Sequence, residues 1–258
     1  MISYQSQKQE SGGVAESPIS CWTGLAVLCI VGLLGVGCAG PTTSEVSHTT
    51  IAQAHLPSDR AVPHHPDSLM HVQVVEGDET ITLEFDEAHE SIWRDWSATW
   101  NTRPSISSRA ADRAQPLSFA TLQSQDMALA ALHREMGIET LSKDVALERI
   151  EERKEELQEY IQIEVYVYTD PEWARFSDLD RPAQRVRLRD EAGNQYDPVR
   201  TEVSGATTVY PRDERMLYRK NVFLFERNVE RGDLLSVADR LSLDVRGEDE
   251  FFFTWSFD

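Results

Sequence analysis

The sequence predicts an α+β protein, with an antiparallel β-sandwich in its C-terminal half and two or three helices inserted after an N-terminal β-hairpin. Three observations support this prediction. Apolar residues follow helical spacing between residues 87 and 160, whereas they alternate with polar residues from residue 161 onwards. In that second part, turn signals separate the short apolar runs about every 8–12 residues, as they do in sandwiches.

The folded part is predicted to begin near residue 69 with a β-hairpin. Residues 71–75 and 80–85 alternate apolar and polar side chains, and Gly77 with Asp78 provides a turn signal between them. We therefore expect two antiparallel strands at the start of a domain that extends over residues 69–258.

A helix is predicted at residues 87–100, and its tryptophans are the first candidate binding residues. Trp93, Trp96 and Trp100 recur at i, i+3 and i+7, which places them in one stripe of the helix. If it is buried, this stripe docks the helix on the sheet; if it is exposed, its flat aromatic faces can stack on a sugar. We favour docking and keep a glycan as the alternative ligand.

Two further helices are predicted, at residues 117–136 and 142–160. The first is rich in Ala and Leu and is followed by Gly137, a residue that often ends a helix, and Ser142 is a suitable N-cap for the second. Opposite charges at i,i+3 stabilise the second helix by only a few tenths of a kcal/mol per pair, so its apolar stripe must pack on another element. We interpret its charged face as solvated surface.

Strands are predicted mainly from residue 161 to residue 258. The last of them places Phe251, Phe253, Trp255 and Phe257 on one face, which predicts a buried core strand. Residues 188–196, Leu-Arg-Asp-Glu-Ala-Gly-Asn-Gln-Tyr, resemble the L-x-D-x-x-G-x-x-Y hairpin of some immunoglobulin-like domains of exported bacterial proteins. The resemblance implies an immunoglobulin-like sandwich and carries no activity.

An uncharged, largely apolar run over residues 21–37 ends at Cys38, and no Cys follows it in the sequence. The residues around this Cys, Leu-Gly-Val-Gly-Cys-Ala at positions 34–39, resemble the lipobox of bacterial lipoprotein precursors. The resemblance implies that residues 1–37 are a signal peptide. It also implies that Cys38 carries a diacylglycerol and an amide-linked acyl chain such as palmitate, which anchor the protein in a membrane of the cell envelope.

The residue after Cys38 helps to predict which membrane the lipid anchor enters. In bacteria with two membranes, the family uses Asp at this position for retention in the inner membrane, and Ala39 stands there instead. The resemblance therefore implies the outer membrane, on its periplasmic or surface face. An uncleaved transmembrane helix and plain secretion are the alternatives.

Residues 38–68 are predicted to form a flexible tether, because they are rich in Pro, Thr, Ser, Ala and His and lack sustained periodicity. A flexible chain of this length has an average reach of about 30 Å. Its histidines are interpreted as solvated linker residues, because no metal-ligand spacing repeats among them. They are His48, His55, His64 and His65.

The formal net charge of −19 disfavours a nucleic acid partner, because an acidic surface repels phosphate backbones. The basic residues are mostly Arg rather than Lys, a bias that is similar to that of proteins from salt-rich habitats. High ionic strength screens crowded carboxylates. A codon preference for Arg is the alternative explanation.

No catalytic motif is found in the sequence, and we expect no cofactor. An acidic cluster could bind Ca²⁺ through loop oxygens, although chance explains it better in so acidic a chain; its residues are Asp170, Glu172, Asp178 and Asp180. No other metal site is expected. The sequence therefore favours a non-catalytic binding or assembly module with an envelope protein or a glycan as its partner. A glycan-binding protein that uses the tryptophan stripe and an envelope hydrolase with paired carboxylates are the alternatives.

Overall fold

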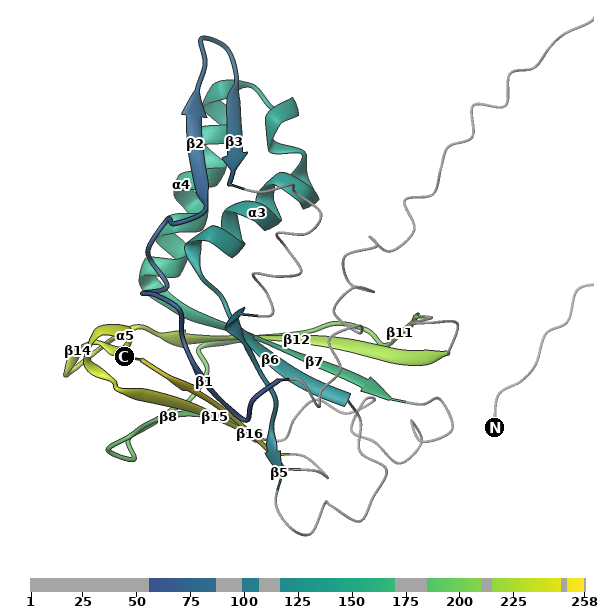
Figure 1. Cartoon of the computed structure of the whole chain (residues 1–258), viewed down its shortest axis with the longest axis vertical. Helices are drawn as coiled ribbons and strands as arrows, with labels where there is room; N and C mark the ends of the chain where they lie inside the picture. Colours follow the sequence, from purple (N-terminus) through teal and green to yellow (C-terminus); the bar gives the residue numbers. More distant parts are fainter. Residues whose placement is uncertain are drawn as a thin grey trace, which may run out of the picture. The chain divides into compact units, whose positions relative to one another are not determined.

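The computed structural model describes residues 56–86, 99–106, 117–169, 185–209, 215–246 and 250–257. The chain divides into two compact units, Met1–Cys38 and Ala39–Asp258, and every described residue belongs to the second. The described residues form mainly antiparallel sheets together with the helices α3 (Gln125–Met136), α4 (Lys143–Glu159) and α5 (Leu234–Val237), as Figure 1 shows. This confirms the α+β class.

Two six-stranded sheets, here named sheet I and sheet II, make up most of the fold. Sheet I consists of β1 (Asp59–Ala61), β5 (Ser105–Ile106), β8 (Arg185–Asp190), β9 (Gln195–Tyr196), β15 (Arg240–Arg246) and β16 (Glu250–Ser256). Sheet II consists of β4 (Asn101–Thr102), β6 (Leu117–Leu122), β7 (Tyr160–Thr169), β10 (Arg200–Val203), β11 (Thr207–Val209) and β12 (Met216–Glu226). Among the described pairs, only β1 with β16 is parallel.

One hydrophobic cluster joins the two sheets. Sheet I contributes Leu243 and Trp255, and sheet II contributes Ile163 and Phe225, all of them fully buried. The alternation predicted for the last strand is confirmed, because Phe253 and Trp255 are buried in this cluster while Phe252, Thr254 and Ser256 are partly exposed. Two sheets that share one core are compatible with a β-sandwich.

A second hydrophobic cluster holds the N-terminal hairpin against the helices. The hairpin of β2 (Val72–Glu76) and β3 (Ile81–Phe85) is confirmed, and it lies beside α3 and α4 in Figure 1. Ile81 and Leu83 of the hairpin pack with Leu129 of α3 and Ile150 of α4. The apolar stripe of α4 thus packs on other elements, as we expected because the ion pairs of this helix are too weak to stabilise it by themselves.

The predicted helix 117–136 is wrong over its first turns. Residues 117–122 form β6, which pairs in antiparallel register with β7. The helix begins only after Ser124, whose side chain accepts a hydrogen bond from the backbone N–H of Met127, and it ends at Gly137 with φ of 54°. Pairing with a long strand outweighs the helix propensity of the Ala and Leu residues in this segment.

The helix predicted at 142–160 is confirmed as α4, which follows Ser142. Its i,i+3 ion pairs are also present, for example Arg149–Glu152 with 2.6 Å between Nη1 and Oε2. Of the helix predicted at 87–100, only Thr99 and Trp100 are described, and both are helical. The rest of that prediction lies outside the described residues.

The β8–β9 hairpin explains the motif at residues 188–196. The buried carboxylate of Asp190 accepts hydrogen bonds from the backbone and side chain of Asn194, at 2.8 and 2.7 Å, and from the Tyr196 hydroxyl at 3.0 Å. Gly193 has φ of 85°, a conformation that favours glycine. Asp190, Gly193 and Tyr196 therefore shape the turn, whereas Leu188 is buried in the core.

Candidate functional site

Residues 56–72, here named the N-terminal strap, pack against the folded body. Residues 56–68 were predicted to be part of the tether, and this prediction is wrong. β1 pairs with β16, and the N–H of Val62 donates a 2.9 Å hydrogen bond to the carbonyl of Ser256. An edge strand needs only its backbone to pair, so the polar composition of the segment does not prevent docking.

The start of the strap packs on the outer face of sheet II, the face turned away from the shared core. Leu56 is buried there among aromatic rings, and two of them, Phe119 and Tyr166, stack with 4.8 Å between their centroids. The carbonyl of Pro57 accepts hydrogen bonds from the backbone N–H of Arg103 and from the Thr102 hydroxyl, both at 2.9 Å. The strap is therefore attached at its first described residues.

The end of the strap is held by one buried carboxylate. Asp126, in the first turn of α3, accepts the backbone N–H groups of Met70, His71 and Val72 at 3.1–3.2 Å. A carboxylate at a helix N-terminus is also stabilised by the helix dipole. Asp126 thus stabilises both the start of α3 and the end of the strap.

His64 packs inside this arrangement, which corrects its interpretation as a solvated linker residue. Its ring lies edge-on to Trp100 with 5.2 Å between centroids, and its Nε2 is 3.8 Å from Asp126 Oδ2. The side chain is 18% exposed. Trp100 is itself buried, and its carbonyl accepts a 2.9 Å hydrogen bond from Trp255 Nε1.

Burial lowers the pKa of His64 below its ordinary value of 6.5, and the nearby charge of Asp126 opposes this effect without reversing it. The folded protein therefore binds this proton less readily than the unfolded chain. The stabilisation is complete above pH 6.5 and is lost as the pH falls from 6.5 through the folded pKa. We expect the His64 ring signals to titrate below pH 6.5 in NMR, and a His64→Gln variant to lose this part of the pH dependence. A measured pKa above 6.5 would contradict the buried placement.

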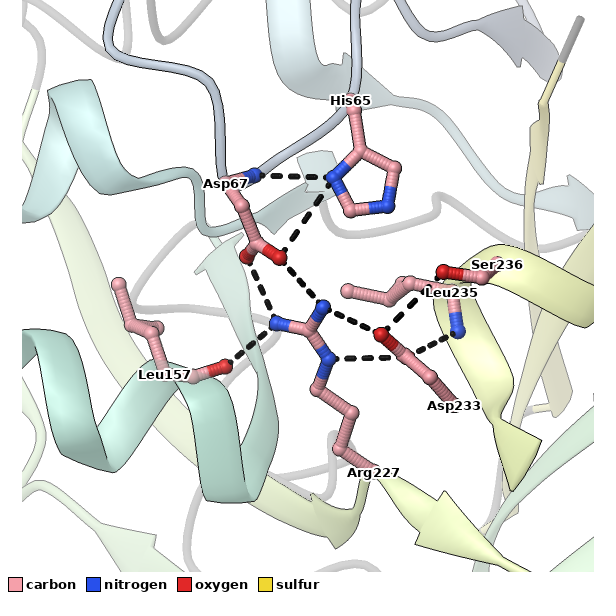
Figure 2. A network of polar contacts seen from close by, with 7 residues as sticks. All are labelled: His65, Asp67, Leu157, Arg227, Asp233, Leu235 and Ser236. Atoms are coloured by element: carbon pink, nitrogen blue, oxygen red, sulfur yellow. Dashed lines mark hydrogen bonds and ion pairs between the residues drawn. The ribbon is translucent and has the colours of Figure 1, made fainter.

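Arg227 fastens the middle of the strap, as Figure 2 shows. Its guanidinium forms a two-armed ion pair with Asp67, with 2.7 Å between Nη1 and Oδ1, and a second one with Asp233, at 2.9 and 2.6 Å. Its Nη1 also donates to the carbonyl of Leu157 at 2.9 Å. These partners belong to the strap, to the end of α4 and to β14 (Gly232–Asp233), so one side chain joins three segments.

The charges in the Arg227 network stabilise one another. Burial alone would lower the pKa of Arg227, but the hydrogen bonds and charges of Asp67 and Asp233 raise it above the ordinary arginine value. The hydrogen bond from Arg227 in turn lowers the pKa of Asp233 below 3.8, although burial opposes this. Asp233 also caps α5 by accepting the N–H of Leu235 at 3.0 Å. The network therefore holds Arg227 and Asp233 in their charged forms at neutral pH.

Most residues of the predicted sites lie outside the described residues, namely Cys38, Trp93, Trp96, Asp170, Glu172, Asp178 and Asp180. Trp100 is the exception, and its burial removes it from any exposed aromatic row. Within the described ranges, no group of three or more His, Cys, Asp and Glu side chains is placed to hold a metal ion.

Buried carboxylates of the two sheets have cationic partners. Asp244 pairs with Arg189 at 2.8 Å and with Arg246 at 2.9 Å, and Glu164 pairs with Lys220 at 2.8 Å. The hydrolase alternative requires two acids that share one site, and these carboxylates are instead neutralised separately. We assign them a structural role.

An open groove of about 440 Å³ lies along the charged face of α4. Its lining includes Arg153 and Glu156, which pair with each other, and Arg200, whose Nη2 lies 2.5 Å from Glu156 Oε1. Charges that compensate one another in this way are typical of solvated surface, as the sequence predicted for this helix face.

Sequence reasoning missed the residues that hold the strap. Asp126 could have been found, since it follows Ser124 at a helix start once the strand before it is recognised. For Asp67 and Arg227 no local signal exists, because 160 residues separate them. No family model matches the chain, and no curated protein or solved structure matches it either. Among the described residues, no helix has the length and apolar character needed to cross a membrane.

Proposed function

We propose that the protein is a lipid-anchored lipoprotein of the bacterial cell envelope that acts as a non-catalytic binding or assembly module. The lipobox-like residues around Cys38 carry the anchor in this proposal. The motif hairpin, with Asp190, Gly193 and Tyr196 in turn-forming roles, supports an immunoglobulin-like sandwich as the binding scaffold.

The N-terminal strap defines how such an anchor would hold the body. Because residues 56–72 are bound, the free tether in this proposal comprises residues 38–55 and not 38–68. By the same scaling its average reach is about 20–25 Å, which is shorter than the length of tether that the sequence suggests. The module would therefore work within a few nanometres of the membrane that carries it.

The proposed partner is another envelope component, a protein or a glycan. A net charge of −19 disfavours nucleic acid and favours partners that do not carry dense negative charge. The glycan alternative depends on Trp93 and Trp96 alone, since Trp100 is buried. Because Ala39, and not Asp, stands directly after Cys38, the proposed membrane is the outer membrane where the cell has one.

A Cys38→Ala variant tests the anchor. We expect the unmodified protein to partition into the detergent phase and its N-terminal peptide to gain the mass of a diacylglycerol and an acyl chain on Cys38. The variant is expected in the aqueous phase. Cys29→Ala is the matched control, since Cys29 lies in the segment predicted to be removed. A Cys38→Ala variant that stays in the detergent phase, or a mature protein that begins at Met1, would contradict the proposal.

A further inference from the structure

One edge of sheet II is open to solvent at β10. This strand is the last of its sheet, it pairs with β12 on one side, and no described strand pairs with its other side. All four residues of β10 are exposed, as are Val199 before it and Ser204 after it. An open edge of this kind can pair with the backbone of another strand, so it is a candidate surface for association.

The backbone of β10 is oriented for such pairing. The N–H of Ser204 donates a 2.9 Å hydrogen bond to a carbonyl of β12. Alternate residues of an antiparallel strand direct their N–H and C=O groups to the same neighbour, so those of Arg200 and Glu202 also face β12. The N–H and C=O groups of Thr201 and Val203 therefore point away from the sheet, towards a strand that could lie beside it.

The side chains of this edge are divided between the two faces of the sheet. Thr201 is opposite a core residue of β12, so Val199, Thr201 and Val203 lie along the inner face. Val199 and Val203 are nevertheless 54% and 40% exposed. Arg200 and Glu202 lie along the outer face, with 3.1 Å between Nε and Oε1. The edge thus presents apolar side chains on one face and one charge of each sign on the other.

We propose that two copies of this chain pair antiparallel through β10, with a twofold axis at Thr201. In this register Val199 is opposite Val203 of the second copy, and Arg200 is opposite Glu202 of the second copy. Each of these contacts occurs twice, because a twofold interface is self-complementary. Opposite charges, and apolar side chains, that face each other across two strands stabilise an antiparallel pair. The outward N–H and C=O groups of Thr201 bond to those of its own copy.

The charges of β10 specify this register. Moving the axis by one residue places Arg200 opposite Arg200, or Glu202 opposite Glu202, and like charges directly opposite each other destabilise a strand pair. The net charge of the chain is −19, so two copies repel each other over most of their surface. The two charges of β10 cancel, and at this edge two copies can therefore meet with less repulsion.

A strand pair of this length makes a small interface, so we expect a weak dimer in solution. Anchoring both copies in one membrane would raise their effective concentration and favour the dimer. The inference goes beyond the proposed function, because it names a second copy of the chain as an assembly partner. Pairing itself requires neither the lipid anchor nor another envelope component.

Charge exchange tests the proposed register, and sedimentation equilibrium of the full chain at up to about 1 mM is the measurement. We expect a monomer–dimer equilibrium for the unmodified protein. Arg200→Glu and Glu202→Arg should each weaken the dimer about 10-fold or more, because each replaces two attractive pairs by two repulsive ones. The double variant should restore the dimer. An equimolar mixture of the two single variants should form heterodimers, because each Glu of one chain then faces an Arg of the other.

Arg240→Glu is the matched control, because it makes the same change of charge at an exposed residue of β15, inside sheet I, and it should leave the dimer unchanged. A protein that is monomeric at every concentration would overturn the inference. A dimer that resists both single reversals, or that neither the double variant nor the mixture restores, would overturn it as well.

Hydrogen exchange distinguishes a second copy from another occupant of the edge. The amides of Thr201 and Val203 should exchange fast in dilute protein and more slowly as the dimer forms. Slow exchange in a protein that is monomeric would show that another part of the same chain covers the edge, and would overturn the inference. The anchor is tested separately, because Cys38→Ala should dimerise as the unmodified protein does.

Discussion

Replacing Arg227 with Met is expected to lower the free energy of unfolding by about 2–4 kcal/mol, because it leaves two partly buried carboxylates without their partner. Asp67 and Asp233 would each lose a two-armed ion pair, and the carbonyl of Leu157 would lose a donor. The loss should be largest at neutral pH. It should shrink below about pH 3.8, where protonation of Asp233 weakens the network in the unmodified protein too.

Urea denaturation followed by circular dichroism measures this effect. Arg200→Met is the matched control, since Arg200 pairs with Glu156 but is 53% exposed, and we expect a change of about 1 kcal/mol or less. Equal effects of the two substitutions would show that the Arg227 network contributes no more than a surface ion pair. The strap would then not be an integral part of the fold.

Replacing Trp255 with Ala is expected to cost about 3–5 kcal/mol, the second large effect. Trp255 is fully buried in the cluster between the sheets, and its Nε1 donates a 2.9 Å hydrogen bond to the carbonyl of Trp100. The substitution therefore leaves a cavity and an unpaired carbonyl together. Because these two tryptophans are 155 residues apart, the effect also reports on the packing of β16 against the segment that enters β4.

Two companion variants separate these contributions. Trp255→Phe keeps much of the ring but loses the donor, so an intermediate loss is expected. Phe252→Ala removes a partly exposed ring from the opposite face of the same strand, and we expect a loss of about 1 kcal/mol. If Phe252→Ala proved as harmful as Trp255→Ala, the assignment of the inner face of β16 would be wrong.

Local periodicity was sufficient to predict several elements. The alternation over β7 and β16 and the helical stripe of α4 are regular enough to identify their type, and the turn at Gly77 correctly separated β2 from β3. In α4 and β16, the burial of one face follows from the elements packed on it, so local pattern and tertiary structure agree. β7 is buried on both faces, with Ile163 in the core shared by the sheets and Tyr166 in the aromatic cluster of the outer face.

Other elements depend on partners that the local sequence does not reveal. β6 contains residues suited to a helix and becomes a strand because β7 offers a full edge to pair with. The strap is polar and rich in Pro, and its order comes from Asp126, Arg227 and β16, which lie far from it in the sequence. Composition alone therefore predicts a tether there, and only the distant partners correct it.

The candidate sites also differ in whether the local sequence is enough to predict them. The anchor at Cys38 remains a prediction from local sequence, as does a glycan contact through Trp93 and Trp96. Trp100 shows how helical spacing leaves the choice between docking and binding open, since burial decides it.

Hydrogen exchange of the N-terminal strap is the most direct test of this account. We predict slow exchange for the amide of Val62, which donates to Ser256, and for those of Met70, His71 and Val72, which donate to Asp126. Arg227→Met should accelerate exchange across residues 56–72 before it affects β7. If residues 56–72 of the unmodified protein exchange as fast as an unstructured peptide, the strap is a tether after all and the account fails.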